Sequence, residues 1–466
     1  MVDLQENFPF YNRLRDVLRP YSAYLVGGAV RDRLLNRPVH DLDFSLPERT
    51  LEAARKAADR LGGAYFTLDD QRDAGRVILE ASDGRRHRID FTTFQGEDLE
   101  SDLRARDFTI TAMAFPVENP DQLIDPLGGL ADLRQKLIRS CSAEAMQADP
   151  VRILRGVRMA ADYRFRIEDR TRELIRRAVS ELSGVSPERI RDELFRILGS
   201  ERPVTAVRAL NVLGISPGLF GPGGKVPDER LRALGKLEQF WDALARDYDP
   251  DTGASWGSGL LVKFLGRYRD RVQEHLHQEL VWERSLKDLL AFNVLISGGP
   301  PLTDGRQPQD NFGQRFRLSS QEIQRLTAVS RGAAAFLEDF RSGGGTSSLD
   351  IHRYYRNFGG AGVEAVFFAL AEVNLGENTG GMDDRWVDLL GQARTYLEAW
   401  WEKHDQVVSP PRLIDGHQLI EALHIEPGPQ VGEILQAVQE GQVSGRINNR
   451  DQALALAGRL IEDGAA

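Results

Sequence analysis

Cysteine is almost absent from this sequence of 466 residues, in which Cys141 is the only one. A single cysteine excludes an intrachain disulfide framework and suits a reducing compartment. No run of 18 apolar residues occurs, and the stretch from Met1 to Asn7 has neither the basic region nor the apolar region of an export signal. We therefore expect a soluble, cytoplasmic protein, and the length predicts two or more domains.

Lysine is also scarce, with 7 residues against 53 arginines, and the formal net charge is −10. An acidic chain is unexpected for a protein that binds nucleic acid, because phosphate neutralisation supplies much of that affinity. The segment from Arg134 to Arg202 differs, since it holds 16 Lys and Arg against 11 Asp and Glu. A guanine- and cytosine-rich genome would explain the general preference for arginine, whereas the local excess indicates an anionic partner.

A pair of glycines follows the short apolar segment Tyr24–Val26. Gly27 and Gly28 permit a turn with positive φ, and residues 30–35 then have helical periodicity. Backbone N–H groups at the start of such a helix can face phosphate oxygens. The stretch therefore predicts a turn that binds a triphosphate.

Carboxylates alternate with apolar residues a little further on. Asp41 and Asp43 flank Leu42, so they project from the same face of a half-buried strand, and a second alternating strand supplies Asp90. Neighbouring carboxylates repel one another and raise each other's pKa unless a cation lies between them. Hard oxygen ligands favour Mg²⁺, and three acids on adjacent strands suit two-metal nucleotidyl transfer. Alone, an Asp-x-Asp pattern is more often a turn or a solvated strand edge.

The pattern of secondary structure changes along the chain. Short strands are predicted at 64–66, 76–80, 87–92 and 113–115, among helices, so the first 140 residues form a mixed α/β region with a small sheet. From residue 148 onward the periodicity is helical almost throughout. Ser186 followed by Pro187 predicts the start of a helix that runs to Leu198.

Four motifs now occur in a characteristic order: Gly-Gly-x-Val-Arg-Asp at 27–32, Asp-x-Asp at 41–43, Arg-Asp-Phe-Thr-x-x-Ala-Met-Ala at 106–114, and the arginine-rich run at 149–158. This order resembles the superfamily of class II tRNA nucleotidyltransferases and bacterial poly(A) polymerases. The match covers residues 20–200, and the remaining residues resemble the superfamily only weakly.

The resemblance implies an α+β fold in which a nucleotidyltransferase head with a small mixed β-sheet and helices precedes an all-α neck, body and tail. The head would span residues 1–140. A helical neck at 141–200 would carry the nucleobase-binding and RNA-binding motifs, a helical body would span 201–300, and a helical tail at 301–466 would bind tRNA.

The resemblance also implies a role for each motif residue. Asp41, Asp43 and Asp90 would be the catalytic carboxylates and bind the metal. Asp107 would read the ribose 2′-hydroxyl, while Asp149 and Arg152 would hydrogen-bond the Watson–Crick edge of the incoming base. The full nucleotide-binding set implied by the motifs is Gly27, Gly28, Arg31, Arg106, Asp107, Asp149, Arg152, Arg155 and Arg158.

The implied activity is template-independent addition of C, C and A to the 3′ end of tRNA from CTP and ATP, with Mg²⁺. Only 15 residues, 91–105, separate Asp90 from Arg106. Many CCA-adding relatives have a longer flexible loop there, and enzymes that add only CC are among those that lack it. A CC-adding activity, with a separate A-adding enzyme as partner, is therefore a second possibility. Poly(A) polymerase and a non-catalytic RNA-binding protein are further alternatives.

Two residues depart from the family pattern, since Ala148 stands where the family often has Glu and Thr111 where it usually has Asn. Both departures bear on base selection, although Asp149 and Arg152 still supply an acceptor and a donor.

Three features of the distal half have structural interpretations. Trp386, Tyr396, Trp400 and Trp401 could stack on nucleotides, but their helical spacing favours a core or an interdomain seam. His275 and His277 lie where some relatives carry a metal-dependent phosphohydrolase motif, which is missing here, so we expect both histidines to be exposed to solvent. An amphipathic helix is predicted after Pro427–Pro429, where the sequence resembles the tail of bacterial family members that hold the tRNA elbow.

Overall fold

The computed structural model describes residues 4–69, 73–80, 86–221, 224–245, 256–297, 307–343, 346–373 and 384–464. The chain forms two compact units, Met1–Lys225 and Val226–Ala466. Their boundary falls inside the segment predicted as the helical body, and the finer division into four parts stays a prediction. Across the residues described, no helix has both the length and the apolar character needed to cross a membrane.

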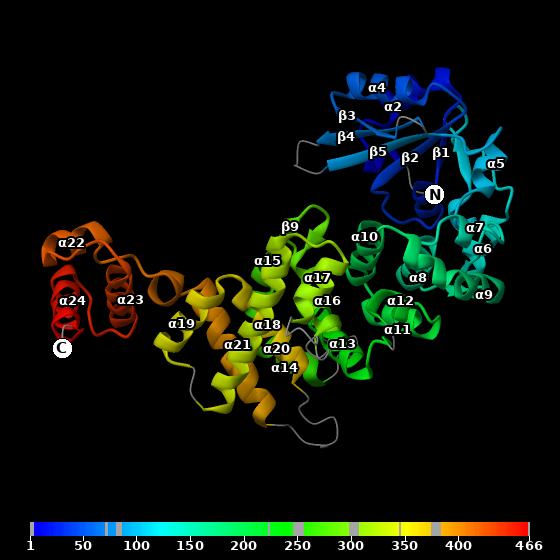
Figure 1. Cartoon of the computed structure of the whole chain (residues 1–466). Coiled ribbons are helices and arrows are strands. Elements are labelled where there is room, and N and C mark those ends of the chain that lie inside the picture. Colours follow the sequence, from blue (N-terminus) through cyan, green and yellow to red (C-terminus); the bar gives the residue numbers. More distant parts are fainter. Residues whose placement is uncertain are drawn as a thin grey trace. The chain divides into compact units, whose positions relative to one another are not determined.

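A six-stranded mixed sheet lies in the first unit, in the order β3-β4-β5-β2-β1-β6 (Figure 1). Only β2 and β5 pair in parallel, and the other neighbours are antiparallel. Each predicted strand is present, and the small mixed sheet is confirmed. The strands are β1 (Tyr24–Val26), β2 (Asp41–Leu46), β3 (Ala64–Asp69), β4 (Ala74–Glu80), β5 (Arg86–Thr93) and β6 (Ala114–Pro116).

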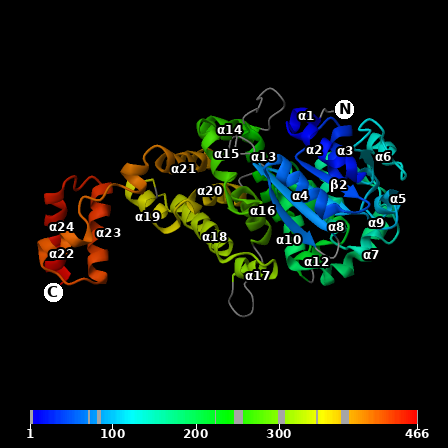
Figure 2. The ribbon, with the colours of Figure 1, turned by 90° about the horizontal axis from the view of Figure 1, so that it is seen from above.

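Helix α4 (Thr50–Leu61) packs across the strands β3, β4 and β5, with α2 (Tyr11–Leu18) beside it (Figures 1 and 2). Its buried face consists of small residues, and Gly75 of β4 lies so close that a Cβ there would be 3.2 Å from the Cβ of Ala54. Small side chains on both elements therefore bring this helix close to the sheet.

Helices fill the rest of the first unit. Helix α8 (Arg152–Tyr163) packs against α10 (Pro187–Leu198) and α11 (Pro203–Val212). The predicted start of α10 is confirmed, because the Ser186 hydroxyl accepts a hydrogen bond from the backbone N–H of Arg189. The other helices and short strands are α3 (Gly28–Leu34), α5 (Leu99–Arg104), α6 (Gly129–Gln135), β7 (Leu137–Ile138), α7 (Ala145–Ala148), β8 (Arg166–Ile167), α9 (Asp169–Ala178) and α12 (Ser216–Phe220).

The second unit is helical apart from a small hairpin. Helix α20 (Ala361–Glu372) is buried along nearly its whole length, and it packs closely on α18 (Ser320–Arg341), where a Cβ at Gly332 would lie 2.9 Å from the Cβ of Ala365. The first elements of the second unit are α13 (Asp228–Ala243), α14 (Trp256–Leu265), α15 (Arg269–Leu276), β9 (Glu279–Val281), β10 (Arg284–Ser285), α16 (Leu286–Ile296), α17 (Pro308–Arg315), α18 (Ser320–Arg341), α19 (Ser348–Phe358), α20 (Ala361–Glu372) and α21 (Asp384–Trp401).

The expectation of two exposed histidines is wrong for His275. Its side chain is buried, with Nε2 lying 3.1 Å from Oε2 of Glu364, and Arg325 donates two hydrogen bonds to the same carboxylate. A buried carboxylate needs such partners to offset its lost hydration. His277 is exposed, as predicted.

The aromatic residues of α21 belong to the core of the second unit, as their spacing predicts. Tyr396 is fully buried, and its ring centroid lies 4.9 Å from that of Tyr354. Trp400 packs on Tyr355, with ring centroids 5.0 Å apart, and the other two tryptophans also contact aromatic rings of the unit. The alternative role in nucleotide stacking therefore has no support from these contacts.

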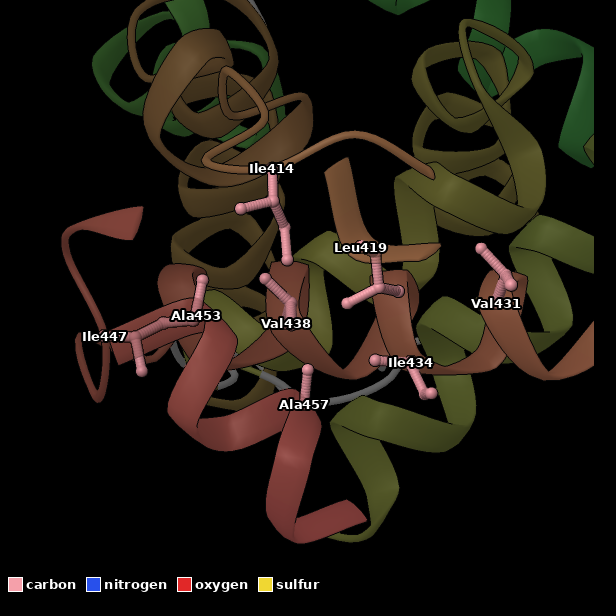
Figure 3. Packing of buried hydrophobic residues seen from close by; sticks show 8 residues of the cluster. All are labelled: Ile414, Leu419, Val431, Ile434, Val438, Ile447, Ala453 and Ala457. Atoms are coloured by element: carbon pink, nitrogen blue, oxygen red, sulfur yellow. The ribbon is translucent and has the colours of Figure 1, made fainter. Parts of the chain in front are cut away.

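Three helices close the chain: α22 (Gly416–Leu423), α23 (Pro429–Val443) and α24 (Arg450–Gly464). The predicted amphipathic helix after Pro427 is confirmed as α23, whose buried side chains meet those of α22 and α24 in one apolar cluster (Figure 3). Glu440 joins α23 to α19, because it accepts hydrogen bonds from Arg353 at 2.5 Å and from Arg356 at 2.8 Å.

Candidate active site

The glycine turn lies directly against two other predicted site residues. Gly27 connects β1 to α3 with φ +72 and ψ −139, a conformation that residues with a Cβ rarely adopt. A Cβ there would lie 3.1 Å from Oδ2 of Asp43 and 3.5 Å from Nη1 of Arg106. The glycine turn, the strand β2 that carries Asp43 and the motif that begins at Arg106 therefore meet at one point.

The predicted carboxylates lie on neighbouring strands. In the parallel pairing of β2 with β5, Asp43 is opposite Asp90, and Asp41 is opposite Arg88. The prediction that the three acids lie on adjacent strands is therefore confirmed, although their role as metal ligands stays a prediction. Burial and the nearby charge of Asp90 raise the pKa of Asp43 to about 6.

Two of the three carboxylates, those of Asp90 and Asp41, accept hydrogen bonds from arginines. Arg76 of β4 donates hydrogen bonds of 2.7 and 2.9 Å to the two oxygens of Asp90, and Arg88 donates one of 2.5 Å to Asp41. In the described part of the chain, no three His, Cys, Asp or Glu side chains stand in a geometry ready for a metal ion. The donor chemistry fits a hard divalent cation, and Arg76 and Arg88 hold carboxylate oxygens that such a cation would take as ligands.

Arg106 follows α5 and reaches β2. Its Nη2 donates hydrogen bonds to Oγ of Ser45 at 2.9 Å and to Oδ2 of Asp102 at 3.1 Å. Its Nε is buried and has no hydrogen-bond partner among the described residues. A buried donor without a partner is costly, so this N–H is suited to an anionic ligand at the turn.

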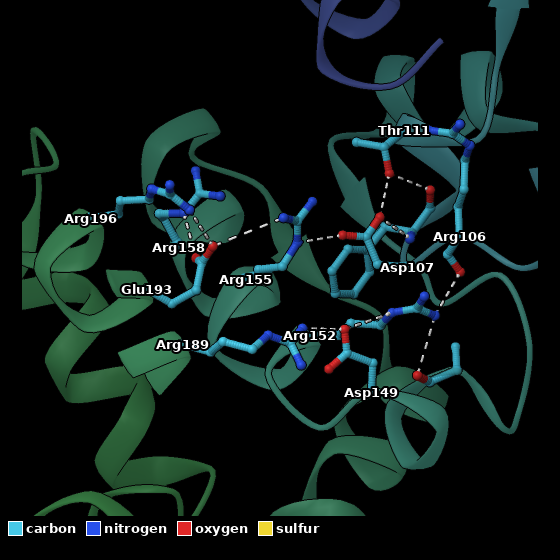
Figure 4. Close-up of polar contacts among 12 residues, drawn as sticks. Arg106, Asp107, Thr111, Asp149, Arg152, Arg155, Arg158, Arg189, Glu193 and Arg196 are labelled. Carbon is cyan, nitrogen blue, oxygen red and sulfur yellow. Dashed lines mark hydrogen bonds and ion pairs between the residues drawn. The ribbon is translucent and has the colours of Figure 1, made fainter. Parts of the chain in front are cut away.

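Asp107 is fixed by three partners. One oxygen accepts hydrogen bonds from the Thr111 hydroxyl at 2.7 Å and the Phe108 backbone N–H at 2.9 Å, and the other accepts from Nε of Arg155 at 2.8 Å (Figure 4). Burial raises the pKa of Asp107, but Arg155 and these hydrogen bonds outweigh it and hold the pKa at about 2. Thr111, where the family usually has Asn, thus supports this carboxylate.

Arg31 is buried near the glycine turn rather than extended into solvent. Its Nε and Nη2 donate to the carboxylate of Asp32 at 2.9 and 2.8 Å, and its guanidinium stacks on the ring of Tyr163, 4.3 Å from the centroid. The same guanidinium lies close to Gly28, where a Cβ would be 3.3 Å from Nη2. In this arrangement Arg31 braces the turn, and its predicted contact with a triphosphate stays a prediction.

Two cavities of the first unit are lined by the residues that are predicted to recognise the base. Asp149, Arg152 and Arg189 border both a cavity of about 370 Å³, which Arg106, Asp107 and Arg155 also line, and a second cavity of about 1170 Å³. Arg152 and Asp149 lie 3.9 Å apart, which is too long for a hydrogen bond. Nη1 of Arg152 instead donates to the carbonyl oxygens of Arg106 and Ala145, at 3.3 and 3.4 Å.

The predicted arginines of α8 share a buried carboxylate. Glu193 of α10 accepts hydrogen bonds from Arg158 and Arg196, both at 3.0 Å, and lies 3.9 Å from Arg155 (Figure 4). Burial raises the pKa of Glu193, but the three arginines outweigh it and lower the pKa. Residues three apart on α8 thus face one side, as the helical spacing predicts.

Four residues of the site were not identified by sequence reasoning: Arg76, Arg88, Arg189 and Glu193. Arg189 and Glu193 lie within 141–200, the segment that the resemblance assigns to the nucleobase-binding neck, and this placement is the signal that could have identified them. Arg76 had no such signal, because its pairing with Asp90 depends on the register of β4 and β5.

Comparison with known proteins gives the same assignment along the chain. Residues 23–139 match the family described as "Poly A polymerase head domain", residues 164–227 match "Probable RNA and SrmB-binding site of polymerase A", and residues 391–457 match tRNA nucleotidyltransferase domain 2. The head and the site next to it thus define the class of nucleotidyltransferases with a poly(A) polymerase head.

Full-length relatives narrow this class. A CC-adding tRNA nucleotidyltransferase of Geobacter sulfurreducens is 32% identical over 93% of this chain and 90% of its own length. An A-adding tRNA nucleotidyltransferase of Deinococcus radiodurans is 28% identical over 97% of this chain and 99% of its own. This chain therefore belongs to the tRNA nucleotidyltransferase family.

The fold agrees with that assignment. A solved structure of a CCA-adding enzyme in complex with ATP is similar over 99% of this chain and 96% of its own, with a TM-score of 0.65 at 23% identity. At this identity the likeness establishes the arrangement of the backbone, and side-chain roles rest on the geometry of the site.

Proposed function

We propose that this protein adds two cytidine monophosphates from CTP to the 3′ end of tRNA, and that a separate enzyme adds the terminal A. The observation that carries the proposal is the meeting of Gly27, Asp43 and Arg106, with Asp90 on the next strand. This combination places a glycine turn, carboxylate oxygens that suit a metal ion and the positive charge of Arg106 together, as nucleotidyl transfer requires.

The restriction to CC rests on the connection after β5. The structure passes from Thr93 to α5 at Leu99 through only 94–98, so the 15-residue link lacks room for the long loop of many CCA-adding enzymes. The Geobacter sulfurreducens relative, which is named as CC-adding, supports the same choice. The Deinococcus radiodurans relative, which is named as A-adding, shows that A addition can be a separate activity in this family.

Asp41, Asp43 and Asp90 would hold Mg²⁺ once Arg76 and Arg88 release them. When bound, Mg²⁺ would favour the attacking form of the RNA 3′-hydroxyl and stabilise negative charge on the α-phosphate and the leaving pyrophosphate. Gly27 and Gly28 leave room for the triphosphate, and Arg31 supports their turn. Arg106, Arg155 and Arg158 would supply positive charge for the phosphates.

Asp107 would accept a hydrogen bond from the ribose 2′-hydroxyl, which a deoxynucleotide lacks. Asp149 would accept a hydrogen bond from the amino group of the base, and Arg152 would donate to the neighbouring ring nitrogen. Cytosine offers both groups on its Watson–Crick edge. Base choice would therefore come from protein side chains, with no nucleic-acid template.

The test is incorporation into tRNA that lacks its last three nucleotides, with Mg²⁺ and CTP, ATP or both, followed by sequencing of the 3′ ends. We expect ends that stop at CC with both nucleotides present. Ends of CCA would overturn the CC restriction. Addition of A alone to tRNA ending in CC, or a long A tail on unrelated RNA, would overturn the choice of substrate.

Variants connect this activity to the carboxylates. Asp41→Ala and Asp43→Ala should abolish incorporation and leave the folded state intact, whereas Asp59→Ala, an exposed carboxylate of α4, should keep wild-type activity. Full activity of Asp43→Ala would contradict the proposed catalytic site. The wild type and the Asp59→Ala variant should require the same concentration of divalent cations for incorporation.

A further inference from the structure

Asp149 is held by an arginine from another helix. Nη2 of Arg189, on α10, donates a 2.7 Å hydrogen bond to Oδ2 of Asp149, across 40 positions of sequence. Figure 4 shows the Arg189 side chain reaching toward the loop that carries Asp149. The other oxygen of this carboxylate, Oδ1, is buried and has no hydrogen-bond partner among the described residues. One oxygen is thus fixed and the other is available.

Arg152 and Asp149 form a long ion pair with no hydrogen bond between them. Nη1 of Arg152 donates to the carbonyl oxygens of Arg106 and Ala145, and its Nε lies 3.9 Å from Oδ2 of Asp149. Opposite charges at this distance would form a closer, two-bond pair if the carboxylate turned toward the guanidinium. The hydrogen bond from Arg189 holds the carboxylate in another orientation.

This separation matters for reading a base. Cytosine presents an amino donor beside a ring nitrogen that accepts, and uracil presents a carbonyl acceptor beside an N–H donor. A free carboxylate oxygen and a free guanidinium N–H side by side match the first pattern and reject the second. If Asp149 and Arg152 formed hydrogen bonds with each other, neither group would be available to the base.

We propose that Arg189 is a positioning residue for base selection. It keeps Asp149 from closing into a hydrogen-bonded pair with Arg152 and leaves Oδ1 of Asp149 to accept a hydrogen bond from the amino group of the base. This inference rests on the proposed function, because it assumes that CTP is the substrate. In this role Arg189 acts through Asp149 and not by a hydrogen bond of its own to the base.

Steady-state kinetics test the inference in the full-length protein with Mg²⁺, CTP or UTP, and tRNA lacking its last three nucleotides. Arg189→Met keeps the length of the side chain and removes its charge. We expect the KM for CTP to rise about tenfold and the preference for CMP over UMP to fall about tenfold, with kcat and the KM for tRNA changed less than about twofold. Arg189→Lys should restore most of the loss. Arg176→Met, an exposed arginine of α9, is the matched control and should behave as the wild type.

A double-mutant cycle separates positioning from a general structural effect. In the background of Asp149→Asn, which removes the charge that Arg189 holds, Arg189→Met should change the KM for CTP less than about twofold. An equal effect of Arg189→Met in both backgrounds, or no effect on CTP in either, would overturn the inference while CMP addition by the wild type still supports the proposed function. A wild type that adds no CMP would overturn the proposed function, and the inference with it.

Discussion

Nε of Arg155 donates a 2.8 Å hydrogen bond to Oδ2 of Asp107, and this ion pair joins α8 to the segment after α5. The pair connects the head-side motif at 106–114 to the helix that carries the next motif. Asp107 raises the pKa of the Arg155 guanidinium, so both partners stay charged at any physiological pH. The two motifs therefore behave as one electrostatic unit.

Thr111→Val tests the support that Asp107 receives. The variant removes the hydroxyl that donates to Oδ1 at 2.7 Å within a buried site, so we expect the free energy of unfolding to fall by about 1–3 kcal/mol. Calorimetry of the full-length protein measures the change. Thr111→Ser keeps the hydroxyl and should lose much less. Equal losses in both variants would show that the methyl group, and not the hydrogen bond, carries the effect.

Gly27→Ala tests the close approach of the turn to Asp43. The added Cβ would lie 3.1 Å from Oδ2 of Asp43 at a positive φ, so the carboxylate must shift, and we expect CMP incorporation to fall about 100-fold. Gly62→Ala is the matched control, because Gly62 has φ +74 with no atom within 4 Å of its Cβ position. It should lose about 1 kcal/mol of stability and keep its activity. Similar activities of the two variants would contradict the assigned contact.

Glu440→Gln tests a pH-dependent contribution to the second unit. The hydrogen bonds from Arg353 and Arg356 lower the pKa of Glu440 to about 2, below that of an unfolded glutamate. The ionised form therefore stabilises the folded state above the unfolded pKa of about 4.3, and this contribution is lost as the pH falls toward 2. At neutral pH we expect the variant to be less stable by about 1–2 kcal/mol, since Arg353 is half exposed.

Tryptophan fluorescence measures this change selectively, because all 6 tryptophans lie in Val226–Ala466. In urea titrations, the difference between the wild type and Glu440→Gln should shrink as the pH is lowered. Glu433→Gln, an exposed glutamate of the same helix, serves as the control and should follow the wild type at every pH. A difference that stays constant down to acidic pH would contradict the ionic contribution.

Glu193→Gln tests the carboxylate shared by the arginines of α8 and α10. Glu193 is only 3% exposed, and the substitution removes the charge that Arg158 and Arg196 share, so that Arg158 keeps only its weaker ion pair with Asp162 at 3.5 Å. We expect the first unit to lose about 2 kcal/mol of stability in calorimetry. Glu188→Gln, an exposed position at the start of the same helix, should change stability by less than about 0.5 kcal/mol.

The sequence was sufficient to predict features with a local signal. Alternation around Leu42 and Ile89 predicts β2 and β5 and the face of each strand on which its carboxylates lie, whereas the register that sets Asp43 opposite Asp90 depends on the pairing of the two strands. Ser186 and Pro187 predicted the start of α10 because capping depends on neighbouring residues. These elements are determined within a few residues of chain.

Contacts between distant residues could not be predicted in this way. The stacking of Arg31 on Tyr163, the hydrogen bond from Arg189 to Asp149 and the pair of Arg76 with Asp90 each depend on tertiary packing. His275 has a polar side chain on a polar segment, and only its packing beside Glu364 explains its burial. Buried charged residues that pair with each other leave no periodic pattern in the sequence, so their burial cannot be predicted from it.

The guanidinium groups of Arg76 and Arg88 give the carboxylate strands a built-in counterion. If a divalent cation takes the carboxylate oxygens that these arginines hold, loading of the proposed enzyme is an exchange of counterions and not a simple association. The apparent affinity for the cation would then be lower by the free energy of the arginine contacts that are given up.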